Sequence, residues 1–432
     1  MGARPKPGEP GGSSGIKTTT LPGGLVVITE RLPHIRSVAL GLTFRIGGRD
    51  DPNGLGGMAH MVEHMVFKGT SEKDAVDINI AAESLGAELN AFTDKESTCF
   101  YGRFPGDQTG PVTALLTEIV GGPAFRAVEL DKEKQVVSEE IRTANEDPDS
   151  CAVNLMFTAL YGDHPMGRQI TGSLDSVGVL TDVQLRERYR AFYGPACGVA
   201  VAVGDVEHKA MPSALGPLLG RHGDCRPVER SLPEALPPRA LVETRKELSQ
   251  VYVCLARPGF AYGDPRRHAL SVLNTALGGG VSSRLFQRLR ERDALVYSVA
   301  SFTELYADSG FIGIYFVTDH RKLGRCLEVI REELVRLRKD RLTSEEFERA
   351  RNMTKSSVLL ALESPTSRMM RLARTYQLLG RVVTVDETLE AFNRLVPEDV
   401  ARLIDDLLDG GFHHAGAVGP LSGAEFSSML NA

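Results

Sequence analysis

The sequence predicts an α+β protein of two related domains, each a β-sheet with helices packed on it. The chain has 432 residues, which is more than one ordinary hydrophobic core holds. A segment rich in Pro and charge, residues 226–240, divides it into two halves of comparable length. Each half opens with a strand pattern, a turn and an apolar helix. We therefore expect a first domain over residues 17–225, a linker, and a second domain over residues 241–432.

The elements of the two halves follow one another in the same order. In the first half, the alternating segment SVALGLTFRIGG (37–48) precedes the apolar helix MAHMVEHMVF (58–67). In the second half, QVYVCLARPG (250–259) precedes the turn and helix at 260–280. Later strand segments also correspond loosely, LNAFTDKESTCFYGRF with YSVASFTELYADSGFIGIYF. This repetition indicates a duplication, and the helix of the second half lacks the histidine pair of the first.

Composition places the chain among globular proteins and argues against two classes of partner. Hydrophobic residues make up 42% and charged residues 25%. The formal net charge of -6 argues against nucleic acid as the main partner, because phosphate binding needs a basic surface. No run approaches the roughly 20 apolar residues that span a bilayer, so no membrane partner is expected.

The first 16 residues and the cysteines point to a cytoplasmic location. The leader, residues 1–16, is rich in Gly, Pro and Ser, has no apolar core of a secretory signal, and is expected to be disordered. The six cysteines are widely spaced and form no CxxC motif. We therefore expect buried free thiols in a reducing cytoplasm. Cys99 has no role that the sequence assigns.

Three ionisable residues, His60, Glu63 and His64, stand in the apolar helix pattern. Positions i and i+4 of a helix lie about 40° apart and i+3 falls on the same side, so the three side chains converge. Two imidazoles at this spacing can bind one zinc ion. Glu63 then stands beside the metal as a base for the water that the metal activates. The alternative, two core histidines and a chance glutamate, is less favoured because an unpaired buried Glu is rare.

A third metal ligand has to come from elsewhere, because catalytic zinc sites usually have three protein ligands. The helical segment at 131–150 offers Glu133, Glu139 and Glu140. Glu133 and Glu140 are seven residues apart and share a face, whereas Glu139 points about 100° away. The residues alone leave the choice open, and three glutamates on a helix also fit a solvated face.

With these motifs the chain resembles the pitrilysin/insulinase family of inverted zinc metallopeptidases, in particular the short subfamily of the mitochondrial processing peptidase β subunit. The family motif is H-x-x-E-H followed some 75 residues later by a glutamate, and the step from His64 to Glu140 fits it. The resemblance implies one zinc per chain, held by His60, His64 and Glu140, with Glu63 as the general base. It also implies that Glu133 supports the site from outside the metal.

The resemblance further implies residues that bind the substrate. The segment LNAFTDKEST looks like the family's substrate strand, so Asn90, Ala91 and Phe92 would lie at an open sheet edge that pairs with an extended peptide. The alternative is that Asn90 merely ends a strand. The segment LGGGVSSRLFQRLRERDALVYSVAS is similar to the family's domain without metal, where an arginine and a tyrosine reach into the catalytic chamber. Those residues are Arg290 and Tyr297 here.

In the family, this sequence would adopt the LuxS/MPP-like metallohydrolase fold and form half of a clam-shell chamber. The expected activity is zinc-dependent hydrolysis of peptide bonds in short or unfolded polypeptides, for processing or peptide turnover. Both the zinc motif and the Arg/Tyr pair are present in one chain, which favours a homodimer over a heterodimer with a related chain. The alternative function is a non-catalytic or heterodimer partner subunit of a processing peptidase.

Overall fold

The first domain is built on a six-stranded sheet. The structure is a computed structural model, and it describes residues 15–216, 218, 225, 228–234, 236–409 and 411–431. Residues 1–14 of the expected leader therefore lie outside the described residues. The strands are β1 (Ile16–Thr20), β2 (Val26–Arg31), β3 (Ser37–Phe44), β4 (Glu88–Thr93), β5 (Thr98–Pro105) and β6 (Gly198–Gly204). Their order is β1-β2-β6-β3-β5-β4, which places β4 at one edge.

The second domain is built on a five-stranded sheet. Its strands are β7 (Arg239–Thr244), β8 (Gln250–Pro258), β9 (Val296–Leu305), β10 (Gly310–Asp319) and β11 (His414–Gly419). Their order is β7-β11-β8-β10-β9. Both sheets contain the same unit of five strands, β2 to β6 in the first domain and β7 to β11 in the second. In each unit the strand that comes first in the sequence pairs in parallel with the strand that comes last, and the other pairs are antiparallel. The strands β2-β6-β3-β5-β4 therefore have the topology of the second sheet, which confirms the prediction of two related α+β domains.

Helices cover the sheets and supply the other half of each core. Those that follow β3 in the first domain are α1 (Met58–Val66), α2 (Ala75–Ser84), α3 (Thr109–Gly121), α4 (Ala127–Glu146), α5 (Pro148–Tyr161), α6 (Leu174–Gly178), α7 (Asp182–Phe192) and α8 (Ala210–Leu215). Those of the second are α9 (Arg267–Gly278), the π-helix η6 (Phe286–Arg292), α10 (Leu323–Asp340), α11 (Ser344–Ala361), α12 (Pro365–Leu379), α13 (Val385–Arg394), α14 (Pro397–Leu408) and α15 (Gly423–Asn431). None of these described helices is both long and apolar enough to cross a bilayer.

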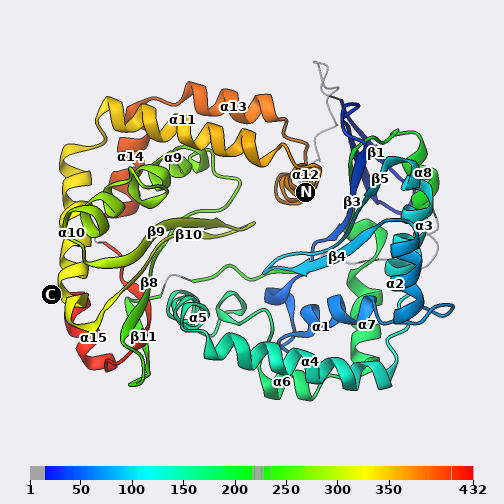
Figure 1. Cartoon of the computed structure of the whole chain (residues 1–432), viewed down its shortest axis with the longest axis horizontal. Helices are drawn as coiled ribbons and strands as arrows, with labels where there is room; N and C mark the ends of the chain where they lie inside the picture. Colours follow the sequence, from blue (N-terminus) through cyan, green and yellow to red (C-terminus); the bar gives the residue numbers. More distant parts are fainter. Residues whose placement is uncertain are drawn as a thin grey trace.

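Two helices are exchanged between the domains and join them (Figure 1). α5, from the first half of the chain, packs on β8 and β11 of the second sheet. α12, from the second half, packs on β3 and β6 of the first sheet. Glycines let both helices approach closely, because a Cβ at Gly416 would lie 2.2 Å from the Ala152 carbonyl oxygen and one at Gly41 would lie 2.4 Å from the Met369 sulfur. Each domain thus buries part of the other's sheet.

The cysteines correct one expectation. Cys197 and Cys225 form a disulfide, so the prediction of free thiols is wrong for these two. The remaining four, Cys99, Cys151, Cys254 and Cys326, are free and buried as expected. The pairing depends on the fold bringing together residues 28 apart in the sequence, and no local spacing reveals it. Disulfides are typical of oxidising compartments, so the cysteines no longer support the expected reducing cytoplasm.

Candidate active site

The helix α1 carries its apolar and ionisable side chains on opposite faces. Its inner face buries Met58, Ala59, Met61, Val62, Met65 and Val66. His60, Glu63 and His64 are half-buried on the other face. The helix begins after Gly57, whose φ of 89° lies in the left-handed region that favours glycine. An apolar stretch therefore holds three ionisable residues because they share the face that turns away from the core.

Asp51 fixes the start of α1. Its Oδ2 accepts hydrogen bonds from the backbone N–H of Gly57 (2.8 Å) and Met58 (3.0 Å), and its Oδ1 accepts one from Ala59 (2.9 Å). These N–H groups have no acceptor within the helix. Burial raises the pKa of Asp51 to about 7, and the three donors act in the opposite direction. Asp51 was not among the predicted site residues, because it lies six positions before the N-cap and outside any local capping motif.

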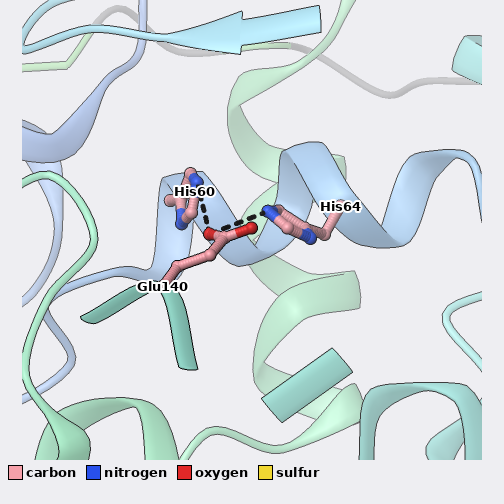
Figure 2. A group of neighbouring side chains, drawn as sticks. All are labelled: His60, His64 and Glu140. Atoms are coloured by element: carbon pink, nitrogen blue, oxygen red, sulfur yellow. Dashed lines mark ion pairs between the residues drawn. The ribbon is translucent and has the colours of Figure 1, made fainter. Parts of the chain in front are cut away.

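The structure brings His60, His64 and Glu140 together. α1 supplies the two imidazoles and α4 supplies the carboxylate (Figure 2). The Nε2 atoms of His60 and His64 lie 3.8 Å and 3.7 Å from Glu140 Oε2. One potential ligand atom from each residue lies within 4.8 Å of the other two. Glu139, the neighbouring candidate, instead forms an ion pair with Arg142 on the exposed side of α4.

These three residues fit a zinc ion. Ligand atoms bound at 2.0–2.2 Å in tetrahedral geometry stand about 3.4 Å apart, close to the spacing between the imidazoles and Glu140. Both imidazole–Glu140 distances exceed hydrogen-bond length, so the imidazoles lie within ion-pair distance of Glu140 without hydrogen bonds to it. Burial, with the neighbouring His64, lowers the pKa of His60 to about 4. His60 is therefore neutral near pH 7, which is the form of imidazole that binds a metal.

Glu133 orients one of the imidazoles. Its Oε2 lies 3.0 Å from His64 Nδ1, and its Oε1 forms an ion pair of 2.7 Å with Lys68. A carboxylate paired with a lysine only accepts hydrogen bonds, so Nδ1 of His64 carries the proton. The lone pair of Nε2 then faces His60 and Glu140, as metal binding requires. The supporting role of Glu133 stays a prediction, and this contact is the one through which it would act.

Glu63 stands between the three candidate ligands and strand β4. Its Oε2 accepts a hydrogen bond of 2.6 Å from the hydroxyl of Thr93, the last residue of β4. Burial raises the pKa of Glu63, and the Thr93 hydroxyl acts in the opposite direction. A carboxylate with a raised pKa is a better proton acceptor than an exposed one. Thr93 was not among the predicted site residues, although it lies on the same face of the strand as Ala91.

The expected substrate residues Asn90, Ala91 and Phe92 lie on β4, which pairs with β5 on one side and stands at the edge of the described sheet. The side chain of Asn90 is used locally, because its Oδ1 accepts a hydrogen bond of 2.8 Å from the Ala91 N–H. That N–H therefore does not point into the ladder with β5. A peptide that pairs with β4 would take the place of this side-chain acceptor.

Arg290 and Tyr297 lie in the second domain and are not brought to the histidines of the same chain. Arg290 is exposed at the end of η6, with its guanidinium 5.1 Å from the Phe286 ring. Tyr297, at the start of β9, is 74% exposed. The other end of β9 adjoins the first domain, since Ala307 N–H donates to Glu96 Oε2 at 2.8 Å. At about 3.3 Å per residue, Tyr297 stands about 26 Å along the strand from Leu305.

Two family models and several solved structures match this chain. Residues 26–173 match the family model "Insulinase (Peptidase family M16)" and residues 180–354 match "Peptidase M16 inactive domain". The metal-ligand candidates fall in the first match, and the second runs from the end of the first domain into the second domain. Among solved structures, a protease from Helicobacter pylori has a TM-score of 0.86 at 21% identity, over 93% of this chain and 98% of that one. A chain from Pseudomonas fluorescens described as a peptidase M16 inactive domain has a TM-score of 0.85 at 23% identity, over 94% and 98%.

Curated relatives cover nearly the full chain. A protein of Streptomyces coelicolor named as an uncharacterized zinc protease is 35% identical over 96% of this chain and 92% of its own length. The zinc protease YmxG of Bacillus subtilis, also named as uncharacterized, is 35% identical over 91% of this chain and 95% of its own length. A sequence identity of 35% over both domains indicates common descent and the same fold. The chain therefore belongs to the insulinase, or M16, family of peptidases.

Proposed function

We propose that the protein is a zinc-dependent endopeptidase that hydrolyses short or unfolded peptides, with one zinc per chain. One observation carries the proposal: Glu63 lies between three convergent metal-ligand candidates and the open edge of β4, and the last residue of β4 binds its carboxylate. A peptide paired with this edge has its backbone beside both the metal site and the base. The relatives named as zinc proteases support the choice of metal and reaction.

Each residue of the site has a separate role in the proposed reaction. His60, His64 and Glu140 would hold a zinc ion, which would supply Lewis-acid polarisation and lower the pKa of a water molecule so that it gives up a proton readily. Glu63 accepts the proton of that water and passes it to the leaving amine nitrogen. Thr93 keeps the carboxylate of Glu63 oriented during both transfers. The backbone of β4 holds the substrate extended, so that the carbonyl to be attacked keeps its position.

The activity is expected to depend on zinc and on the flexibility of the substrate. Unfolded peptides of a few tens of residues should be cleaved by the zinc-loaded protein, because only an extended backbone pairs with β4. Native albumin should stay intact over the same time, since a chamber excludes folded chains. Mass spectrometry of the products, with and without a chelator and with zinc restored, measures this. A protein that binds such peptides without cutting them would instead be a recognition subunit.

We further propose that two chains close into one chamber, in the manner of the short processing-peptidase-β-like branch, and that each site uses residues of both. The curated relatives match this chain over 92% and 95% of their own length, so they are similar to it in size. Tyr297 is exposed, together with Val281 in the same segment, and both are apolar surfaces suited to a partner. In a two-fold dimer, the second domain of one chain faces the metal site of the other. Arg290 and Tyr297 would then contact the substrate and the oxyanion there.

Mixing two inactive variants tests the shared site. Glu63→Gln in one chain and Tyr297→Phe in the other leave one intact site in each mixed dimer if the site is shared. With random exchange about half of the dimers are mixed, so roughly a quarter of wild-type activity should return. If both groups act within one chain, every site keeps a lesion and mixing restores nothing.

Two measurements make the mixing experiment decisive. Tyr297→Phe alone has to be nearly inactive, and native mass spectrometry has to show exchanged dimers. A mixture that stays inactive although the dimers have exchanged would contradict the shared site. Co-purification of a second polypeptide of similar size would contradict the homodimer and indicate a heterodimer.

A further inference from the structure

A cavity of about 810 Å³ lies between the two domains. Its first-domain wall comes from the turn after β4 and from α5, and its second-domain wall comes from β9, β10 and α12. Aromatic side chains form much of the surface, namely Phe157, Phe302, Tyr306, Phe311 and Tyr315. The volume and the mostly apolar lining are those of a ligand pocket.

The cavity shares lining residues with a hollow beside the candidate active site. Ala144 and Ser150 line it and also line a neighbouring hollow that contains Glu140. Asp94 lines it as well, and directly follows Thr93, whose hydroxyl binds Glu63. A peptide extended along β4 past Thr93 would therefore reach Asp94, which lines the cavity. This places the cavity within a few residues of the bond to be cut.

Lys95 is a buried cation on the wall of this cavity. It is 7% exposed, its Nζ donates to the Arg168 carbonyl, and it lies 4.6 Å from the centre of the Phe157 ring. Among the described residues no carboxylate lies within ion-pair distance of it. Burial lowers the pKa of Lys95 to about 8, and no neighbouring carboxylate opposes that effect. A buried ammonium without an anionic partner is rare, because its desolvation is not offset.

The acidic groups on the wall are already engaged. Each of them has a partner other than Lys95: Glu96 pairs with Arg49 and Arg230, Glu304 with Arg374, Asp149 accepts from the Tyr315 hydroxyl, and Asp94 accepts from the backbone of Glu96 and Ser97 and from the Ser97 hydroxyl. Among the described residues that line the cavity, Lys95 is thus the one buried cation without a carboxylate partner. Its remaining N–H donors suit an anion brought by the substrate.

We propose that the cavity is a substrate pocket for a carboxylate, bound by Lys95, with the aromatic wall holding the aliphatic part of the same residue. The proposal rests on the proposed peptidase function. The carboxylate belongs either to an Asp or Glu side chain a few residues from the cut bond or to the C-terminus of a short peptide. A charge-assisted hydrogen bond at a buried site discriminates an acid from its amide by about ten-fold or more.

Matched pairs of peptides test the pocket on the zinc-loaded protein. An internally quenched peptide is made with Glu or Gln at each position in turn, and with a free or amidated C-terminus. At one position, or at the C-terminus, the acid is expected to have about a ten-fold higher kcat/KM than the amide, mostly through KM. A preference at an internal position identifies a side-chain carboxylate, and a preference for the free terminus identifies the terminal carboxylate. The absence of any acid preference overturns the proposal.

Variants assign the preference to Lys95. Lys95→Met should bring the acid-to-amide ratio close to one, and Lys95→Arg should retain it. Lys322→Met is the control, because Lys322 also donates to a backbone carbonyl, that of Ala294, but lies exposed on the second domain. A ratio that Lys95→Met leaves unchanged overturns the proposal. If Lys95→Met does not fold, the Glu/Gln comparison in the wild type and in Lys95→Arg decides.

Binding to an inactive variant separates this proposal from the peptidase function. Fluorescence anisotropy of a labelled acidic peptide is measured on Glu63→Gln and on the same variant with Lys95→Met. We expect at least about ten-fold weaker binding in the second, and none of this difference for the amide peptide. If the wild type cleaves no peptide but this difference is present, the proposed reaction fails and the pocket stands. If peptides are cleaved and the difference is absent, the pocket fails alone.

Discussion

Glu63→Gln is expected to bind zinc as the wild type does and to lose about a thousand-fold in kcat. The amide has the shape of the carboxylate and still accepts the Thr93 hydrogen bond, so α1 and the end of β4 keep their contact. It cannot accept a proton from the attacking water, and general-base catalysis contributes 10²–10⁴-fold. Steady-state kinetics on a quenched peptide, together with metal analysis of the purified variant, measure both effects.

Two further variants test whether the loss of kcat comes from the missing base. Glu83→Gln changes an exposed glutamate on α2 in the same domain and should behave as the wild type. Thr93→Val removes the hydroxyl that orients Glu63 and should lower kcat by a smaller factor, about ten-fold, at unchanged zinc content. If Glu63→Gln lost zinc together with activity, Glu63 would be a ligand or a structural residue and not the base.

Local patterns predicted the parts of the site that lie within one element. The spacing of His60, Glu63 and His64 requires only the 3.6-residue period of a helix, and the structure places all three on one face. The edge position of β4 followed from the resemblance and agrees with the observed strand order. The common topology of the two sheets was visible as repeated strand, turn and helix patterns before any contact was known.

Contacts between elements that are distant in the sequence could not be predicted from such patterns. Thr93 binds Glu63 across 30 residues of sequence, and Arg49 pairs with Asp308 across 259. Both contacts depend on how helices and strands pack against one another, and the spacing of residues in the sequence does not reveal this packing. The Cys197–Cys225 bond and the exchange of α5 and α12 between domains were missed for the same reason. The sequence therefore predicts the chemical groups, and the tertiary structure determines their orientation.

The residues alone did not decide which glutamate of α4 is the third metal ligand. The structure allows a test of Glu140 against Glu139. Glu140 faces both imidazoles, whereas the side chain of Glu139 is 71% exposed and pairs with Arg142. Glu140→Gln is expected to weaken zinc binding by at least about 100-fold and to abolish activity, because an amide is a poor ligand for zinc in a three-ligand site. Glu139→Gln is the matched control on the adjacent position of the same helix and should leave the zinc affinity unchanged.

The zinc affinity of Glu133→Gln should lie between the affinities of Glu140→Gln and Glu139→Gln. The Glu133 carboxylate does not face the metal site but holds the His64 imidazole through Nδ1 and pairs with Lys68. Loss of such an outer partner typically lowers metal affinity 10- to 100-fold. Competition with a chromophoric chelator gives the three zinc dissociation constants, and thermal unfolding of the metal-free variants shows whether the fold persists. An affinity that drops for Glu139→Gln and not for Glu140→Gln would mean that α4 presents the other carboxylate, and the assignment of the site would be wrong.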